Sequence, residues 1–453
     1  MDRIKLYYDN SEIQISTYLL VYFRISGIYV DEKFLNLNQN SLIEIQEYIV
    51  KKNHETINNI DYDAHIFIID KENKHQLDNV IKFASVHPEK GFVITFSNIL
   101  SETEMNQLKK NNINLIISDN EKTLLEELLK KLREENILYK TEYENLYTIY
   151  QSYWKYQLRD LLVISRYSVV KDFDILSQTF VDAILSLPKE DAPSTTWNIQ
   201  FARMYLAYEC NMLCKVFNKR FLCSKDYIIT KLKELLEIKE LNNKSSIILL
   251  LAQTYNDLFN EYNIAYEYYL MPYTKNIAFS YFKKGEYWNI YGKNPTYAIK
   301  YYEKSLLLFP ENYKTWYNLG ISYLNLGKVE DSLSAFQYVN LILKKKYQSH
   351  HLSELEIEYL YKSNELSGHI YHKYFSHYSK ALSYYFSALD IWKTVNKDTY
   401  ISNKNFTVSN IDTHEKLKEI LNIDTLVKNI SHILEQIGNK ELVKSFEHNL
   451  NLF

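Results

Sequence analysis

The sequence predicts an α/β domain with a mainly parallel sheet, followed by an all-α superhelix of paired helices. Short apolar runs alternate with helix-like segments up to about residue 137. Strand-like patterns fade after that point, and long helical patterns replace them. Aromatic residues then recur at a fixed spacing, because Tyr302 and Phe336 lie 34 residues apart, a step typical of stacked helix hairpins.

The first part of the chain has the pattern of five βα units. Ser101–Glu104 (SETE) predicts a capping box at the start of one helix, and Gly27 is expected to end another. Five such units predict a five-stranded, mainly parallel sheet covered on both faces, in a flavodoxin-like layout. The expected strands are Ile4–Tyr8, Ile28–Val30, His65–Ile69, Gly91–Phe96 and Ile113–Ile117, and the other expected helices are Ile15–Ser26, Leu42–Lys52, His75–Ser85 and Thr123–Glu135.

The middle of the chain is predicted to be helical and to lead into the repeats. The expected helices are Tyr143–Leu158, Leu162–Val170, Asp174–Leu187, Thr196–Phe217 and Asp226–Glu240, and Ser245–Phe259 with Ile264–Leu270 forms a weaker repeat. We therefore expect a flavodoxin-like domain at 1–137, a helical region at 138–240, repeats at 241–395, and a loop with closing helices at 396–453.

Three helix pairs carry the clear repeat pattern. The first has Tyr281, Gly285 and Trp288 on one helix and Ala298, Tyr302 and Ser305 on the next, the second runs from about Tyr313 to Lys346, and the third has Gly368, Tyr371, Ala381, Tyr385 and Ala388. The offset between the second and third pairs exceeds one period by about 14 residues, which indicates an insertion at KKKYQSHHLSELEI. This insertion is expected to extend either a helix or the connecting loop.

The segment WYNLG followed by Tyr323 resembles the first helix of a tetratricopeptide repeat. The resemblance covers roughly Tyr281–Trp392, and Ser332 departs from it by standing where alanine is usual. It implies that the structural residues of the repeats are Trp316, Leu319, Gly320, Tyr323, Phe336, Ala298, Tyr302 and Pro310. Gly320 would let the two helices approach closely, and Pro310 would end the preceding helix.

The same resemblance implies a groove, lined by the first helices, that binds a peptide or a protein segment. Matching the groove-facing positions gives Lys314, Tyr317, Ile321, Asn325, Lys362, Glu365, His369 and His372. Such a lining suits a peptide of mixed character. The alternative is that these faces contact only solvent or another part of the chain.

Composition narrows the range of functions. The formal net charge of −3 and the lack of a basic, aromatic-interleaved run give no reason to expect nucleic acid. We expect no membrane-spanning helix, because the apolar segments are far shorter than the roughly 20 residues that a span requires. Three cysteines indicate a reducing compartment, so the cytoplasm is the expected location.

A ligand pocket is conceivable only at the carboxyl ends of the strands. The polar residues expected there are Asp9, Asn10, Ser11, Asp31, Asp70, Ser97 and Asp119. Ordinary solvent-exposed loops would have the same composition. Metal is not expected, because His369 and His372 share a helix face without a third assured ligand.

Two family resemblances compete for the first domain. LYYDNSE and LLVYFRISGIYVD are similar to the opening of a Toll/interleukin-1-receptor (TIR) domain, whose enzymatic members cleave NAD with a glutamate on the helix after the third strand. Here Asp78 is the nearest acid on that helix. HIFIID, which ends in Asp70, resembles the phosphoacceptor strand of receiver domains, with Ser97 at the hydroxyl position. The acidic pair and the lysine of that family are replaced by Asp9–Asn10 and Ser118–Asp119.

The sequence favours a non-enzymatic regulatory or scaffold protein that binds a protein or peptide in the repeat groove and needs no cofactor. The motif GxxxxGK[ST] and the motif GxGxxG are both lacking. The alternative is a TIR-like effector that hydrolyses NAD, with the repeats as its sensor. Homo-oligomerisation is left open.

Overall fold

The structure is a computed structural model of the whole chain. It describes residues 3–8, 13–34, 62–70, 74, 77–86, 90–158, 160–162, 173–192, 195–238, 241, 244–274, 277–348, 352, 354–396, 421 and 423–437. The expected helix Leu42–Lys52 and most of the expected helix Leu162–Val170 lie outside these residues. So does most of the segment predicted to close the repeats.

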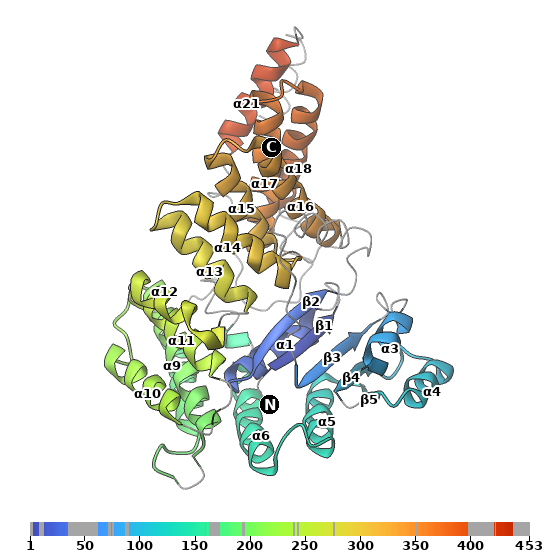
Figure 1. Ribbon diagram of the computed structural model, residues 1–453, viewed down its shortest axis with the longest axis vertical. Coiled ribbons are helices and arrows are strands. Elements are labelled where there is room, and N and C mark those ends of the chain that lie inside the picture. Colours follow the sequence, from blue (N-terminus) through green and yellow to red (C-terminus); the bar gives the residue numbers. More distant parts are fainter. Residues whose placement is uncertain are drawn as a thin grey trace. The chain divides into compact units, whose positions relative to one another are not determined.

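The chain begins with a five-stranded parallel sheet in the order β2-β1-β3-β4-β5 (Figure 1). The order is that of flavodoxin-like folds, and every neighbouring pair is parallel. The predicted fold class is therefore confirmed. The strands are β1 Arg3–Tyr8, β2 Tyr29–Phe34, β3 Ala64–Ile69, β4 Gly91–Phe96 and β5 Asn114–Ser118.

Alternating side chains divide the sheet between two cores. Ile4, Ile66 and Phe92 face a large core that includes residues of α1 (Ile13–Ile25) and α5 (Glu121–Glu134). Tyr7, Phe67 and Val93 face a smaller core with residues of α3 (Leu77–Val86) and α4 (Glu102–Lys110). The capping box predicted at Ser101 is present at the start of α4.

The large core continues from the sheet into the helices that follow it. Leu146 and Tyr153 of α6 (Lys140–Lys155) and Phe201 of α9 (Trp197–Val216) belong to the same buried cluster as residues of β1. The Tyr22 hydroxyl donates to the Leu146 carbonyl at 3.0 Å, and the Tyr153 hydroxyl donates to the Tyr18 carbonyl at 3.1 Å. These helices are α6 Lys140–Lys155, α8 Phe173–Ser186, α9 Trp197–Val216, α10 Lys225–Glu237, α11 Ser245–Gln253, the π-helix η2 Thr254–Leu258, α12 Tyr262–Leu270 and the 3₁₀ turn η3 Pro272–Thr274.

Gly27 shows how closely α9 approaches the first βα unit. Its φ of +77° lies in the left-handed region, which suits the turn that ends α1. A Cβ atom at this position would stand 2.8 Å from the ring of Trp197 at the start of α9. The side-chain amide of Asn198 also donates to the Ser26 carbonyl at 3.2 Å.

The chain divides into two compact units. Unit 1 comprises Met1–Lys283 with Leu307–Pro310, and unit 2 comprises Lys284–Leu306 with Glu311–Phe453. The boundaries expected at 137, 240 and 395 stay predictions. The helices of unit 2 are α13 Ala278–Ile290, α14 Pro295–Leu308, α15 Tyr313–Asn325, α16 Val329–Gln348, α17 Glu354–Lys373, α18 Tyr378–Asn396 and α21 Ile423–Gln436. The first residues of α13, up to Lys283, and the last two residues of α14 are assigned to unit 1.

Three helix hairpins repeat one contact between a glycine and an aromatic ring. A Cβ atom at Gly285 would lie 2.4 Å from the ring of Tyr302, one at Gly320 would lie 2.8 Å from that of Phe336, and one at Gly368 would lie 2.6 Å from that of Tyr385. All three rings are fully buried. The two helices of each hairpin can therefore pack closely, because the glycine on the first helix leaves room for an aromatic ring of the second.

Two departures from the repeat pattern have a structural explanation. Ser332 is buried, and its hydroxyl donates to the Gly320 carbonyl at 2.8 Å, so it ties the two helices of the hairpin together. Most described residues of the insertion lie in helix, because 344–348 end α16 and 354–357 open α17, while the buried Leu352 lies outside both helices. Both helices consequently have 20 residues, whereas α15 has 13. Among the residues that the structure describes, no helix is long and apolar enough to cross a membrane.

Candidate functional site

The carboxyl edge of the sheet brings together part of the predicted ligand pocket. Ser97 and Asp119 follow neighbouring strands and are exposed, and the Ser97 hydroxyl donates to the Asp119 carboxylate. Asp70 follows β3 and is buried, with 2% of its surface exposed. Asp9, Asn10 and Ser11 lie outside the described residues. Within those residues, no group of three or more His, Cys, Asp or Glu side chains is arranged to hold a metal ion.

Asp31 is not at this edge, which corrects the expectation from the sequence. It lies inside β2, beside Lys5 of β1. Its two carboxylate oxygens accept hydrogen bonds from the hydroxyls of Tyr29 at 2.8 Å and Tyr62 at 2.6 Å. Burial, followed by the charge of Asp31, raises the pKa of both tyrosines, so both stay protonated donors.

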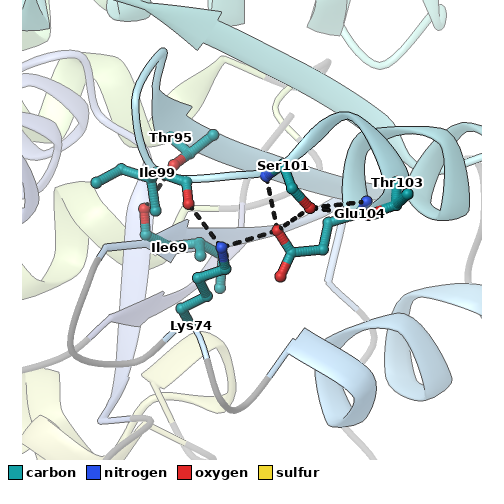
Figure 2. Close-up of polar contacts among 7 residues, drawn as sticks. All are labelled: Ile69, Lys74, Thr95, Ile99, Ser101, Thr103 and Glu104. Carbon is teal, nitrogen blue, oxygen red and sulfur yellow. Dashed lines mark hydrogen bonds and ion pairs between the residues drawn. The ribbon is translucent and has the colours of Figure 1, made fainter.

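A polar cluster around Lys74 and Glu104 connects the segments that follow β3 and β4. Nothing in the sequence indicated that Lys74 would take part in it. Figure 2 shows the Lys74 ammonium group donating to the Ile99 carbonyl at 3.0 Å and pairing with the Glu104 carboxylate at 2.8 Å. The amide and hydroxyl of Ser101 donate to the same carboxylate at 2.7 and 2.6 Å. Lys74 therefore bonds to the capping box of α4, and the cluster holds the start of that helix in place.

The Glu104 cluster predicts a pH-dependent stability difference. The bonds from Lys74 and Ser101 lower the pKa of Glu104 from 4.5 to about 2. A carboxyl group with a lowered pKa stabilises the fold above its unfolded pKa and loses that contribution as the pH falls from 4.5 towards 2. Because the pair is solvent-screened, Glu104→Gln is expected to lower the free energy of unfolding by only about 0.5–1 kcal/mol near neutral pH.

Urea unfolding near pH 7 and near pH 2 measures this difference. Glu102→Gln is the matched control, because Glu102 lies in the same first turn of α4 and is exposed. It removes the same charge from the helix start without removing the contact to Lys74. An equal gap between wild type and Glu104→Gln at both pH values would contradict the prediction.

The residues predicted to line the groove lie on the first helices of the second and third hairpins, α15 and α17. We call Lys314, Tyr317, Ile321, Asn325, Lys362, Glu365 and His369 the first-helix face. Asn325 is exposed and the other six are half-buried.

His372 does not belong to this face, although the repeat spacing placed it there. It is buried, with 5% of its surface exposed. Its ring lies 5.3 Å from that of His432 on α21 and 6.4 Å from that of Tyr385 on α18. Burial, followed by the nearby Lys373, lowers its pKa. His372 therefore packs against the closing helix and cannot line an open groove.

Tyr359 joins the first-helix face, and the repeat pattern did not indicate it. Its ring lies 4.9 Å from that of Tyr317, edge to face, and 5.4 Å from that of Tyr313. Tyr359 stands two residues past the inserted segment, on the turns by which α17 exceeds a standard first helix. The sequence shows only that an aromatic residue stands here. No repeat position corresponds to it, so it could not be assigned to the face.

Comparison with known proteins supports the assignment of the repeats. A family model described as "Tetratricopeptide repeat" matches residues 301–334. The chain contains a tetratricopeptide repeat. The match begins midway through α14, covers all of α15 with Trp316 and Tyr323, and ends within the first turns of α16.

Among solved structures, the chain is similar to "Crystal structure of MamA" with 19% identity over 37% of this chain and 89% of that one, at a TM-score of 0.31. It is similar to "Crystal structure of MamA protein" with 16% identity over 42% of this chain and 92% of that one, at a TM-score of 0.32. These likenesses are too low for an argument about function. A comparison with curated proteins gives no match.

Proposed function

We propose that the chain is a non-enzymatic scaffold protein that binds a protein or peptide segment on the first-helix face of its repeats. The observation that carries this proposal is the half-exposed aromatic pair of Tyr317 and Tyr359 at that face. Aromatic side chains that are packed on one side and open on the other are typical anchors of interfaces. Lysine, glutamate, asparagine and histidine side chains beside them supply polar contacts.

The α/β domain is proposed to support this role rather than to carry out catalysis. The Lys74 ammonium group pairs with the Glu104 carboxylate, and the Ser97 hydroxyl donates to the Asp119 carboxylate. These four side chains therefore already have partners within the domain. Asp78, the acid nearest the TIR catalytic position, is exposed on the first turn of α3. No observation in the described residues favours NAD cleavage.

The proposal is tested by selecting a phage-displayed library of short random peptides on the full-length chain. We expect specific peptides to be enriched, and the best of them to bind Asn325→Arg or Tyr317→Ala about tenfold more weakly, since an anchor residue contributes more than about 1 kcal/mol. Asp390→Lys, on the exposed side of α18, is the matched control and should bind as wild type does. Circular dichroism checks that the variants are folded.

Two outcomes would contradict the proposal. Peptides that bind both first-helix variants as tightly as the wild type would place the binding site elsewhere. Loss of NAD on incubation with the purified chain would favour the TIR-like alternative instead.

A further inference from the structure

His372 is a buried histidine with a ring nitrogen that lacks a hydrogen-bond partner. It lies on α17 with 5% of its surface exposed, and its Nδ1 atom is buried without a partner among the residues that the structure describes. A protonated imidazole carries an N–H donor on both of its nitrogens, so it would need an acceptor at Nδ1. The described residues supply none, and the site therefore suits the neutral form of His372 only.

Aromatic rings and a second histidine surround this ring. The centre of the His372 ring lies 5.3 Å from that of His432 on α21, and 6.0 and 6.4 Å from those of Tyr378 and Tyr385 on α18. The Tyr385 hydroxyl is buried and also lacks a hydrogen-bond partner in the described part of the chain. Burial, followed by the charge of Glu365, raises the pKa of Tyr385, so this hydroxyl stays neutral and cannot balance a proton on His372.

The basic groups around His372 all disfavour a positive charge on it. Lys373 and His369 lie on α17 itself, and His432 faces the ring from α21. Burial, followed by Lys373, His432 and His369, lowers the pKa of His372 from its ordinary value of 6.5. The geometry and the electrostatics therefore point the same way, because the docked helices tolerate a neutral ring and not a charged one.

The helix α21 is held against α17 and α18 by one apolar face. The buried residues of that face follow a helical period and are Leu426, Ile430, Ile433 and Leu434. His432 is exposed beside them, so solvent can deliver a proton to the edge of this contact. Lys428 and Glu435, one turn to either side of His432, are also exposed, and within the described residues neither forms an ion pair with His372 or His432.

We propose that His372 and His432 form a pH-sensitive contact that releases α21 from α17 and α18 when the medium becomes mildly acidic. A proton on His432 would place a positive charge beside the buried ring of His372, and a proton on His372 would create a buried donor without an acceptor. Both charges are better accommodated once α21 has moved away, because water then solvates the two rings. Release would uncover the apolar face of α21 and the part of the third hairpin that it covers.

The direction of the response follows from the lowered pKa of His372. A histidine whose pKa is lowered in the docked state binds more protons in the released state, so docking is more stable at higher pH. Docking of α21 is therefore fully stabilised above pH 6.5 and weakens as the pH falls below 6.5 towards the lowered pKa. This response goes beyond the proposed function, since it does not require that the first-helix face bind a peptide.

Hydrogen exchange of the full-length chain near pH 7.5 and near pH 5, corrected for the intrinsic effect of pH on exchange, tests the inference. Relative to α15 in the same unit, the protection of the α21 amides should fall about tenfold near pH 5, the order expected for one buried donor without an acceptor. His372→Phe keeps a ring but cannot take a proton, so its α21 should be equally protected at both pH values. His377→Gln is the matched control, because it removes an exposed histidine between α17 and α18, and it should respond as wild type does.

Three results would overturn the inference. One is equal protection of α21 at both pH values in the wild type, or a fall that α15 shares. Another is a pH response of His372→Phe as large as that of wild type. His432→Gln gives the third and covers the case in which His372→Phe does not fold, because His432 is exposed. Its response should be smaller than that of wild type, since one of the two charges is gone, and an undiminished response would contradict the role of the histidine pair.

Discussion

Trp316→Ala is expected to lower the free energy of unfolding of unit 2 by about 3–5 kcal/mol, the usual loss for a large aromatic side chain removed from a core. Trp316 is fully buried on α15, and its ring lies 4.5 Å from that of Tyr338 on α16. It is among the largest fully buried side chains of the chain. Urea unfolding of the full-length chain, followed by circular dichroism, measures the loss.

The control for this substitution is Tyr374→Ala. Tyr374 lies just after α17 in the same unit, and 55% of its surface is exposed. Its removal should change the free energy of unfolding by no more than about 0.5 kcal/mol, as is usual for surface positions. If Trp316→Ala and Tyr374→Ala had equal effects, Trp316 would not be a core residue and the description of the hairpin would be wrong.

Tyr22→Ala is expected to lower the free energy of unfolding of unit 1 by a similar amount, about 3–5 kcal/mol. Tyr22 is fully buried on α1, and its ring packs against that of Tyr153 at 5.7 Å. The substitution opens a cavity between α1 and α6 and also leaves the Leu146 carbonyl without the hydrogen bond it accepts from the Tyr22 hydroxyl.

Tyr22→Phe separates these two contributions. It keeps the ring and removes only the hydroxyl, so it should lower the free energy of unfolding by about 1 kcal/mol. Chemical unfolding of both variants in the full-length chain gives the comparison. A loss as large for Tyr22→Phe as for Tyr22→Ala would show that the hydrogen bond, and not packing of the ring, stabilises this junction.

Local sequence patterns predicted much of the fold, because the residues that define a strand or a helix hairpin lie within one strand or one repeat of the chain. The apolar runs at β1, β3 and β4 identified these strands. The repeat resemblance placed Gly320 at a close approach of two helices, and a Cβ atom there would meet the ring of Phe336. The strand β2 was predicted only as far as Val30, because Asp31 and its polar successors do not look like a buried strand. Asp31 is stabilised there by Tyr62, which is 31 residues away and gives no local signal.

The candidate site was predictable only where the repeat period held. Tyr317 and Glu365 were found by matching positions between repeats. Tyr359 has no matching repeat position, because it lies on the extra turns with which α17 begins. His372 was assigned to the open face because its position in the repeat is normally open. Its burial depends on α21, which lacks the repeat signature, and on the ring of His432 in particular. Likewise, the pairing of Lys74 with Glu104 spans 30 residues and has no sequence motif.

The unbroken core that runs from β1 through α1 into α6 and α9 has a consequence for how this chain can be divided. A fragment that ended at residue 137 would carry Tyr22 and its apolar neighbours with one side bare to water, and such surfaces promote aggregation. A fragment that began after α6 would lack the opposite side of the same contact. Sheet and adjoining helices would therefore be inherited, exchanged or lost together in evolution, as a single heritable module.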